Sequence, residues 1–161
     1  MLQLYNSFIV PYLQYGITLW GASSKASLEP IFVLQKRALK LALELPMRTR
    51  TATLFHEPKI RPLHDLYKLY VAIFMYKYNT NALPTTFSNY FVQNSNNHRY
   101  NTRSAPLYRL PLFSTVSCQK SILFQGPKLW NSIPVEIRHS ASITTFKAKM
   151  RVYLAESWSS V

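Results

Sequence analysis

The chain has 161 residues, of which 48% are hydrophobic and 14% aromatic, and it carries 19 Lys and Arg against 6 Asp and Glu. The hydrophobic content argues against intrinsic disorder, and 3 glycines beside 10 prolines favour short helices with defined ends over a strand-and-turn fold. A net charge of +13 predicts a polyanionic partner, because a compact basic fold repels itself. Nucleic acid is the first candidate, an acidic membrane surface is the second, and a merely basic surface is the alternative.

The cysteine and histidine content predicts no metal site and no cofactor. Cys118 is the single cysteine, so neither a disulfide within the chain nor a cysteine-based zinc knuckle can form. The four histidines lie far apart in the sequence. This cysteine usage is typical of the nucleus or cytoplasm, and no secretory signal is recognisable. Polar residues interrupt the apolar run Leu2–Trp20, which therefore predicts a buried helix and no membrane span.

Two helices are predicted in the first third of the chain. The first covers Leu2–Trp20, is kinked or broken at Pro11, and places these residues on one apolar face: Tyr5, Ile9, Tyr12, Tyr15 and Leu19. The second runs from about Ser27, its expected N-cap, to Leu45, with Pro30 in the first turn. Its expected apolar stripe is Leu28, Ile31, Leu34, Ala38, Leu41 and Leu45.

Further helices are predicted at Pro62–Tyr78, with a stripe of Leu63, Leu66, Tyr70 and Ile73, and as a short turn at Leu83-Pro84. Arg109–Phe113 is expected to be extended, and Gln119–Gln125 forms either a short helix or a strand. Gly126-Pro127 predicts a break before a short helix over Lys128–Pro134. The last helix, Ser142–Trp158, groups Phe146, Met150, Tyr153 and Leu154 on one side, and Trp20 and Trp130 are expected to be core residues.

These elements predict a mostly α fold: an N-terminal helical bundle followed by a smaller, mainly helical C-terminal unit. The bundle covers residues 1–92, and the C-terminal unit covers residues 105–161. A polar, Asn-rich and basic linker or loop at residues 93–104 separates them.

The acidic residues argue against catalysis by the isolated chain. Two-metal nucleotidyl transfer requires clustered carboxylates, whereas Asp65 is the single aspartate and the five glutamates are scattered. Phosphate-binding loops, nucleophile elbows and zinc-protease motifs are also missing. No catalytic residue is assigned, and any activity is expected to be binding.

Three basic clusters are candidates for phosphate contact. The first is Lys36, Arg37 and Lys40, continuing into Arg48 and Arg50, with a solvated helix face as the alternative. The second is Arg99, Tyr100 and Arg103, where a ring between cations suits an unpaired base, with a polar linker as the alternative. The third, Lys147, Lys149 and Arg151, is interpreted as solubilising.

Six short motifs follow one another along the chain: LYNSFIVPYLQYGITLWG at 4–21, LQKRA at 34–38, TATLF at 51–55, HRYNTR at 98–103, GPKLWNSIP at 126–134 and FK at 146–147. In this order they resemble the C-terminal, thumb and post-thumb region of jockey-like non-LTR (LINE-type) retrotransposon reverse transcriptases, which are RNA-directed DNA polymerases. The resemblance spans nearly the whole chain.

The resemblance implies position rather than catalysis. The polymerase palm of that family, with its Y-x-D-D aspartates, lies upstream of these motifs and would precede Met1. Residues 1–92 would correspond to a thumb-like region that grips RNA or an RNA/DNA template–primer, beside the palm as a protein partner. The alternatives are a structural module that makes no nucleic-acid contact and a non-functional retroelement remnant.

Overall fold

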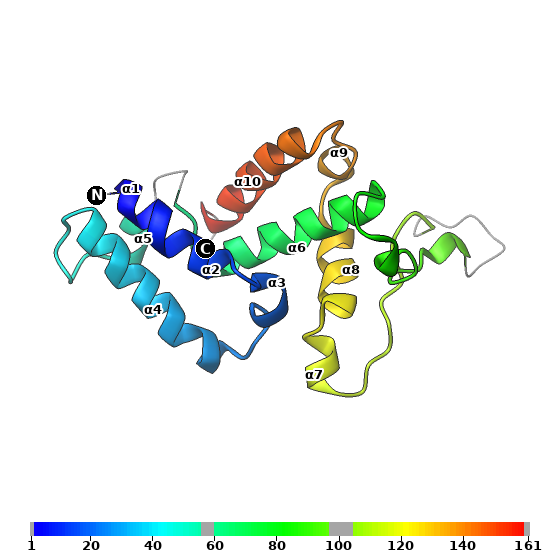
Figure 1. The fold of residues 1–161 in the computed structure, drawn as a ribbon, viewed down its shortest axis with the longest axis horizontal. Coiled ribbons are helices and arrows are strands. Elements are labelled where there is room, and N and C mark those ends of the chain that lie inside the picture. Colours follow the sequence, from blue (N-terminus) through cyan, green and yellow to red (C-terminus); the bar gives the residue numbers. More distant parts are fainter. Residues whose placement is uncertain (1, 56–59, 97–104, 160–161) are drawn as a thin grey trace. The chain divides into compact units, whose positions relative to one another are not determined.

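The computed structural model describes residues 2–55, 60–96 and 105–159 (Figure 1). Every regular element within these ranges is a helix, which confirms the mostly α fold. The chain forms two compact units, Met1–Tyr67 and Lys68–Val161, and the helix α6 (Leu63–Asn79) contributes residues to both. The linker expected at residues 93–104 falls within the second unit, and residues 97–104 lie outside the described ranges.

The predicted first helix is divided into four short elements: α1 (Leu2–Leu4), the π-helix η1 (Tyr5–Ile9), α2 (Val10–Gln14) and α3 (Ile17–Trp20). The wide π turn precedes Pro11, whose ring nitrogen has no hydrogen to donate. The chain then breaks where Tyr15 is extended (ψ 117°) and Gly16 is left-handed (φ 60°).

The expected apolar face of this segment is wrong beyond its first two turns. Tyr5 is buried, but Tyr12, Tyr15 and Leu19 are 80%, 85% and 80% exposed. Leu13 and Ile17 take the core positions instead. The wide turn and the break each rotate the following residues, so a single helical period across Leu2–Trp20 cannot hold.

The second helix, α4 (Lys25–Ala42), begins earlier than predicted, because the hydroxyl of Ser24, not Ser27, caps it by accepting a hydrogen bond from the Ser27 N–H. Pro30 therefore lies in the second turn. The predicted stripe is correct at Leu28, which is buried, but is wrong by about one residue beyond it, where the buried positions are Phe32, Gln35 and Leu39. Leu34 and Leu41 are 61% and 63% exposed.

The first unit packs α4 beside α1 and η1 (Figure 1). Tyr5, Leu39 and Ile60 form the centre of one cluster, and the Phe32 ring stacks on Phe55, which directly follows α5 (Thr51–Leu54), with centroids 5.8 Å apart. Gly21 is required by close packing: an added Cβ would lie 2.4 Å from the Tyr67 ring and 2.5 Å from the Ile17 carbonyl oxygen.

The second unit contains the rest of α6, the 3-10 turns η2 (Thr85–Phe87) and η3 (Asn94–Asn96), α7 (Val116–Gln119), α8 (Ile122–Ser132), α9 (Val135–Arg138) and α10 (Ile143–Ser159). Its core consists of side chains from α6, α8 and α10, from the segment between α6 and α8, and from the residue that follows α8. They are Leu69, Ala72, Met75, Tyr76, Phe91, Tyr108, Trp130, Ile133, Phe146, Met150 and Leu154. The predicted face of the last helix and the core role of Trp130 are confirmed, whereas Trp20 is only half-buried.

The break predicted at Gly126-Pro127 is wrong, because both residues are buried inside α8. An added Cβ at Gly126 would lie 2.8 Å from the Met75 sulfur, so this glycine serves the contact between α8 and α6. The ambiguous segment Gln119–Gln125 is a helical turn that ends at Gln119 and a helix that begins at Ile122.

Candidate nucleic-acid interface

The C-terminal end of α4 holds a basic loop in a defined conformation. Glu44 is left-handed (φ 55°), and the Glu44 and Leu45 N–H groups donate to the Leu41 and Lys40 carbonyls at 3.2 and 2.9 Å. This pattern is a Schellman motif, which ends a helix and satisfies its last carbonyl groups. The Lys40 ammonium donates to the Met47 carbonyl, and so ties the loop back to the helix.

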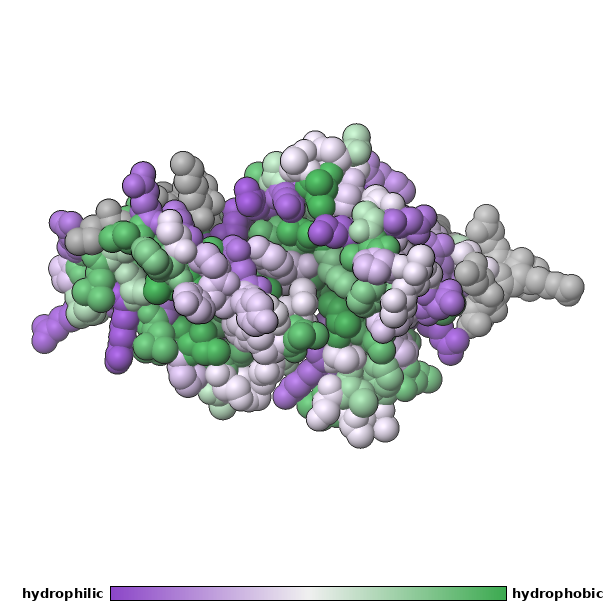
Figure 2. All heavy atoms as spheres, in the orientation of Figure 1, coloured by the Kyte–Doolittle hydropathy of each residue, from purple (hydrophilic) through white to green (hydrophobic). Residues whose placement is uncertain are grey.

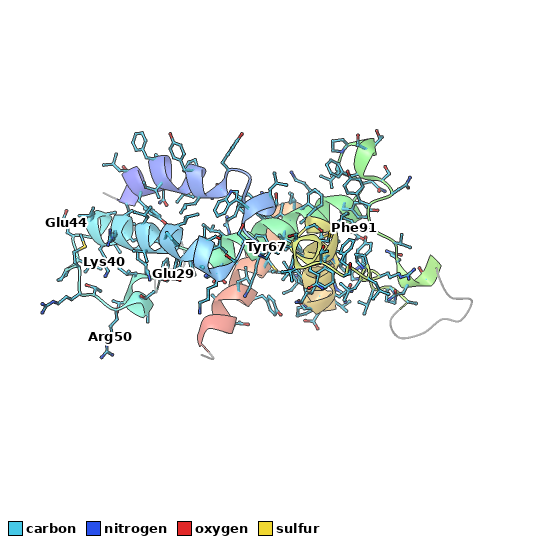
Figure 3. All side chains as sticks on the ribbon, turned by 90° about the horizontal axis from the view of Figure 1, so that it is seen from below. Glu29, Lys40, Glu44, Arg50, Tyr67 and Phe91 are labelled. Carbon is cyan, nitrogen blue, oxygen red and sulfur yellow. The ribbon has the colours of Figure 1, made fainter. Side chains whose placement is uncertain are left out.

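Arg48 and Arg50 extend from this loop. A turn fixes the backbone between them, since both the N–H and the hydroxyl of Thr49 donate to the Pro46 carbonyl at 2.9 and 2.7 Å. Both arginines are exposed, and neither forms an ion pair within the described ranges. Figure 3 shows Lys40, Glu44 and Arg50 around one end of α4, with the Arg50 side chain directed away from the ribbon. Figure 2 shows hydrophilic side chains projecting from this end of the unit.

The three cations predicted on α4 do not form one free surface. The Lys36 ammonium lies 3.7 Å from a Glu29 carboxylate oxygen and 4.5 Å from the centre of the Phe32 ring. The carboxylate offsets part of the Lys36 charge, and the ring attracts the ammonium to the helix surface. Arg37 is exposed and lies on another side of the helix, beside a shallow surface lined by Ala26, Glu29, Pro30, Val33 and Leu34. We define the basic end of α4 as Lys40, Arg48 and Arg50.

The basic clusters predicted at residues 99–103 and on the last helix do not add to this surface. Arg99, Tyr100 and Arg103 lie outside the described residues. On α10, the Lys149 ammonium donates to the Glu136 carbonyl at 3.2 Å, Lys147 is half-buried, and Arg151 is exposed. The structure therefore brings together Lys40, Arg48 and Arg50 from the predicted set.

The first unit exposes five large apolar side chains that the sequence interpretation missed, since it assigned part of them to the core. They are Leu4, Phe8, Tyr12, Tyr15 and Leu19, each at least 56% exposed, and we call them the N-terminal stripe. Residues 1–24 contain no Asp, Glu, Lys or Arg. The stripe thus offers apolar and aromatic contact area without charge, which suits a protein surface better than a phosphate backbone.

The described His, Cys, Asp and Glu side chains form no candidate metal site, since no three of them lie where they could hold one metal ion. Asp65 is 2% exposed. Cys118 is exposed. None of the described helices combines the length and the hydropathy needed to cross a bilayer. No protein-family model, curated protein or solved structure matches the chain.

Proposed function

We propose that the chain contributes non-catalytic, sequence-tolerant binding of RNA or an RNA/DNA template–primer to a jockey-like retrotransposon reverse transcriptase. The observation that carries this proposal is the exposure of Arg48 and Arg50 on a loop held by the Schellman motif and by Lys40. A guanidinium group presents a planar fork of donors that matches two phosphate oxygens. The net charge of +13 supports a polyanionic partner for the surface as a whole.

In this proposal the interface holds the backbone and carries no base information, because phosphates are the same in every sequence. Catalysis belongs to the polymerase palm of the parent enzyme, and this chain requires no cofactor. The site of action is intracellular, in the nucleus or cytoplasm, where a reverse transcriptase meets its template.

The test is the salt dependence of binding to two duplexes of unrelated sequence. Each phosphate neutralised on duplex DNA contributes about −0.9 to the slope of log K against log salt. The double variant Arg48→Gln/Arg50→Gln should flatten that slope by about one unit for each phosphate that it no longer neutralises, and equally on both duplexes. Since both side chains are exposed, the free energy of unfolding should change by less than about 0.5 kcal/mol per residue.

The matched control is Lys25→Gln/Lys68→Gln, which removes the same charge from two other exposed positions, the first residue of α4 and a residue of α6. If the control variant flattens the slope equally, binding depends on the net charge of the chain and not on Arg48 and Arg50 in particular. An unchanged slope in the arginine variant, or no binding by the parent chain at low salt, would contradict the proposal.

A second candidate function is a structural module that packs on a protein partner, and the N-terminal stripe favours it. Five large apolar side chains stand on one uncharged segment, and exposed patches of this kind mark interaction sites. The partner implied by the resemblance is the polymerase palm. Tyr12→Ser/Tyr15→Ser should weaken binding to a separately expressed palm of that enzyme family and leave the salt slope on duplex DNA unchanged. Equal palm binding by variant and parent would count against this module.

A further inference from the structure

Two antiparallel backbone segments of the second unit, residues 92–94 and 107–109, border a surface hollow that none of the predicted sites includes. The Arg109 N–H donates to the Val92 carbonyl at 2.8 Å, and the Asn94 N–H donates to the Leu107 carbonyl at 2.9 Å. Gln93 and Tyr108 form an antiparallel bridge between these two bonds. The backbone on both sides of the hollow is therefore fixed by hydrogen bonds.

The side chain of Asn131 in α8 anchors the segment at residues 107–109. Its amide nitrogen donates to the Tyr108 carbonyl at 2.8 Å, and its amide oxygen accepts from the Tyr108 N–H at 3.0 Å. The Tyr108 hydroxyl also donates to the Asn79 side chain at 3.1 Å. These three bonds hold the residue directly before Arg109, so the start of the Arg109 side chain has a defined position.

The hollow has a volume of about 350 Å³, which lies in the range of small-ligand sites, roughly 300–1,000 Å³. It is lined by aromatic, aliphatic and proline side chains together with Arg109: Tyr90, Phe91, Val92, Pro111, Leu112, Phe113 and Leu123. Phe91, labelled in Figure 3, is 7% exposed and is fixed by edge-to-face contacts with Phe74 and Tyr78. Tyr90 is 43% exposed, so part of its ring is open to a ligand.

The charge of the hollow selects the ligand class. Arg109 carries the only charge among the described lining residues, is exposed, and makes no ion pair with another described residue. A flat apolar group can lie against the rings, while an anion joined to it through a short linker such as a sugar meets the guanidinium. A nucleotide combines these two features, since every base has a face that stacks on aromatic rings and every base is joined to a phosphate.

The geometry points to a subsite for one unpaired nucleotide of a single-stranded RNA or DNA segment. The base lies in the hollow against Tyr90 and Phe113, and Arg109 holds the neighbouring phosphate. This subsite rests on the proposed nucleic-acid binding and adds a preference for unpaired strands, since a base within a duplex cannot present its face.

The experiment measures affinity for three probes: an oligothymidylate, an abasic strand with the same number of phosphates, and a blunt DNA duplex. Tyr90→Ala should weaken oligothymidylate binding about fivefold or more, the usual effect of removing one stacking ring. It should leave the abasic strand and the duplex unchanged. Arg109→Gln should weaken binding of both single strands and leave the duplex unchanged. Tyr12→Ala and Lys68→Gln, on exposed residues outside the hollow, are the matched controls and should leave all three affinities unchanged.

Circular dichroism checks that each variant keeps the helical fold, which is expected because Tyr90 and Arg109 are exposed. Unchanged oligothymidylate affinity in Tyr90→Ala and Arg109→Gln, with salt-dependent duplex binding intact, would overturn the subsite and leave the proposed function standing. Equal losses on the thymidylate and abasic strands in Tyr90→Ala would also overturn it. Failure of the parent chain to bind any of the three probes would overturn both proposals.

Discussion

The side-chain amide oxygen of Gln35 accepts a hydrogen bond of 2.9 Å from the backbone N–H of Leu63, the first residue of α6. The same amide donates to the Arg61 carbonyl at 2.7 Å and to the Tyr5 hydroxyl at 3.1 Å. Gln35 is 1% exposed, so one side chain from the middle of α4 satisfies the start of α6 and joins it to the N-terminal segment. A polar residue at this core position thus fixes the arrangement of three segments.

Replacing Gln35 with alanine should destabilise the first unit by roughly 2–4 kcal/mol, because the Leu63 N–H and the Arg61 carbonyl lose a buried partner. The measurement is the free energy of unfolding in urea. Gln125→Ala is the matched control, since Gln125 makes an exposed bond to the Gln119 carbonyl, and it should cost less than about 1 kcal/mol. If both variants lose the same free energy of unfolding, the buried Gln35 amide contributes no more than an exposed one.

Glu44→Gly should stabilise the chain by about 1 kcal/mol. Glu44 occupies the left-handed position of the Schellman motif at φ 55°, where a Cβ is unfavourable and glycine is not. Glu44→Ala removes the same carboxylate and keeps the Cβ, so it should give no comparable gain. Unfolding midpoints of the two variants separate the effects, and a gain of equal size in both would assign the stabilisation to the removal of the charge.

The register of α4 predicts opposite results for two neighbouring leucines. Leu39 is fully buried, so Leu39→Ala should cost about 2–5 kcal/mol. Leu41 is 63% exposed, so Leu41→Ala should change stability by less than about 0.5 kcal/mol. Thermal or urea unfolding of the two variants checks this order. A larger loss of stability for Leu41→Ala than for Leu39→Ala would contradict the observed register and support the apolar stripe predicted from the sequence.

A comparison of α10 with α4 shows where the sequence predicts the buried face of a helix and where it does not. In α10, Phe146, Met150 and Leu154 stand at helical spacing among polar neighbours, and the predicted face is the buried one. In α4, apolar residues occur on more than one face, and the buried face contains Gln35. Spacing alone cannot rank two apolar faces, and it places a glutamine outside the core. Tertiary hydrogen bonds decide the register here.

The candidate site was predictable to a similar degree. The exposure of Arg48 and Arg50 follows from a polar loop after a helix, which is visible in the sequence. The contacts of Lys36 were overlooked, although Phe32 and Glu29 precede it by four and seven residues, a spacing that places all three side chains on one face of the helix. The hollow beside Arg109 depends on pairing between residues far apart in sequence, which no local pattern encodes.

Tyr67→Phe should stabilise the chain, most strongly at alkaline pH. The ring is half-buried, yet its hydroxyl oxygen is shielded from solvent and has no hydrogen-bond partner among the described residues. Removing this oxygen should gain about 1 kcal/mol at neutral pH. Burial raises the pKa of Tyr67 from 10.0 to about 12, so above pH 10 the unfolded chain ionises this group before the folded chain does. The parent therefore loses further stability as the pH rises from 10 towards 12. Unfolding midpoints at pH 7 and 11 should therefore differ less in the variant than in the parent.

The control is Tyr5→Phe, which removes a hydroxyl that accepts a hydrogen bond from Gln35 and should destabilise the chain at pH 7. A loss of stability in Tyr67→Phe at both pH values would mean that its hydroxyl has a partner.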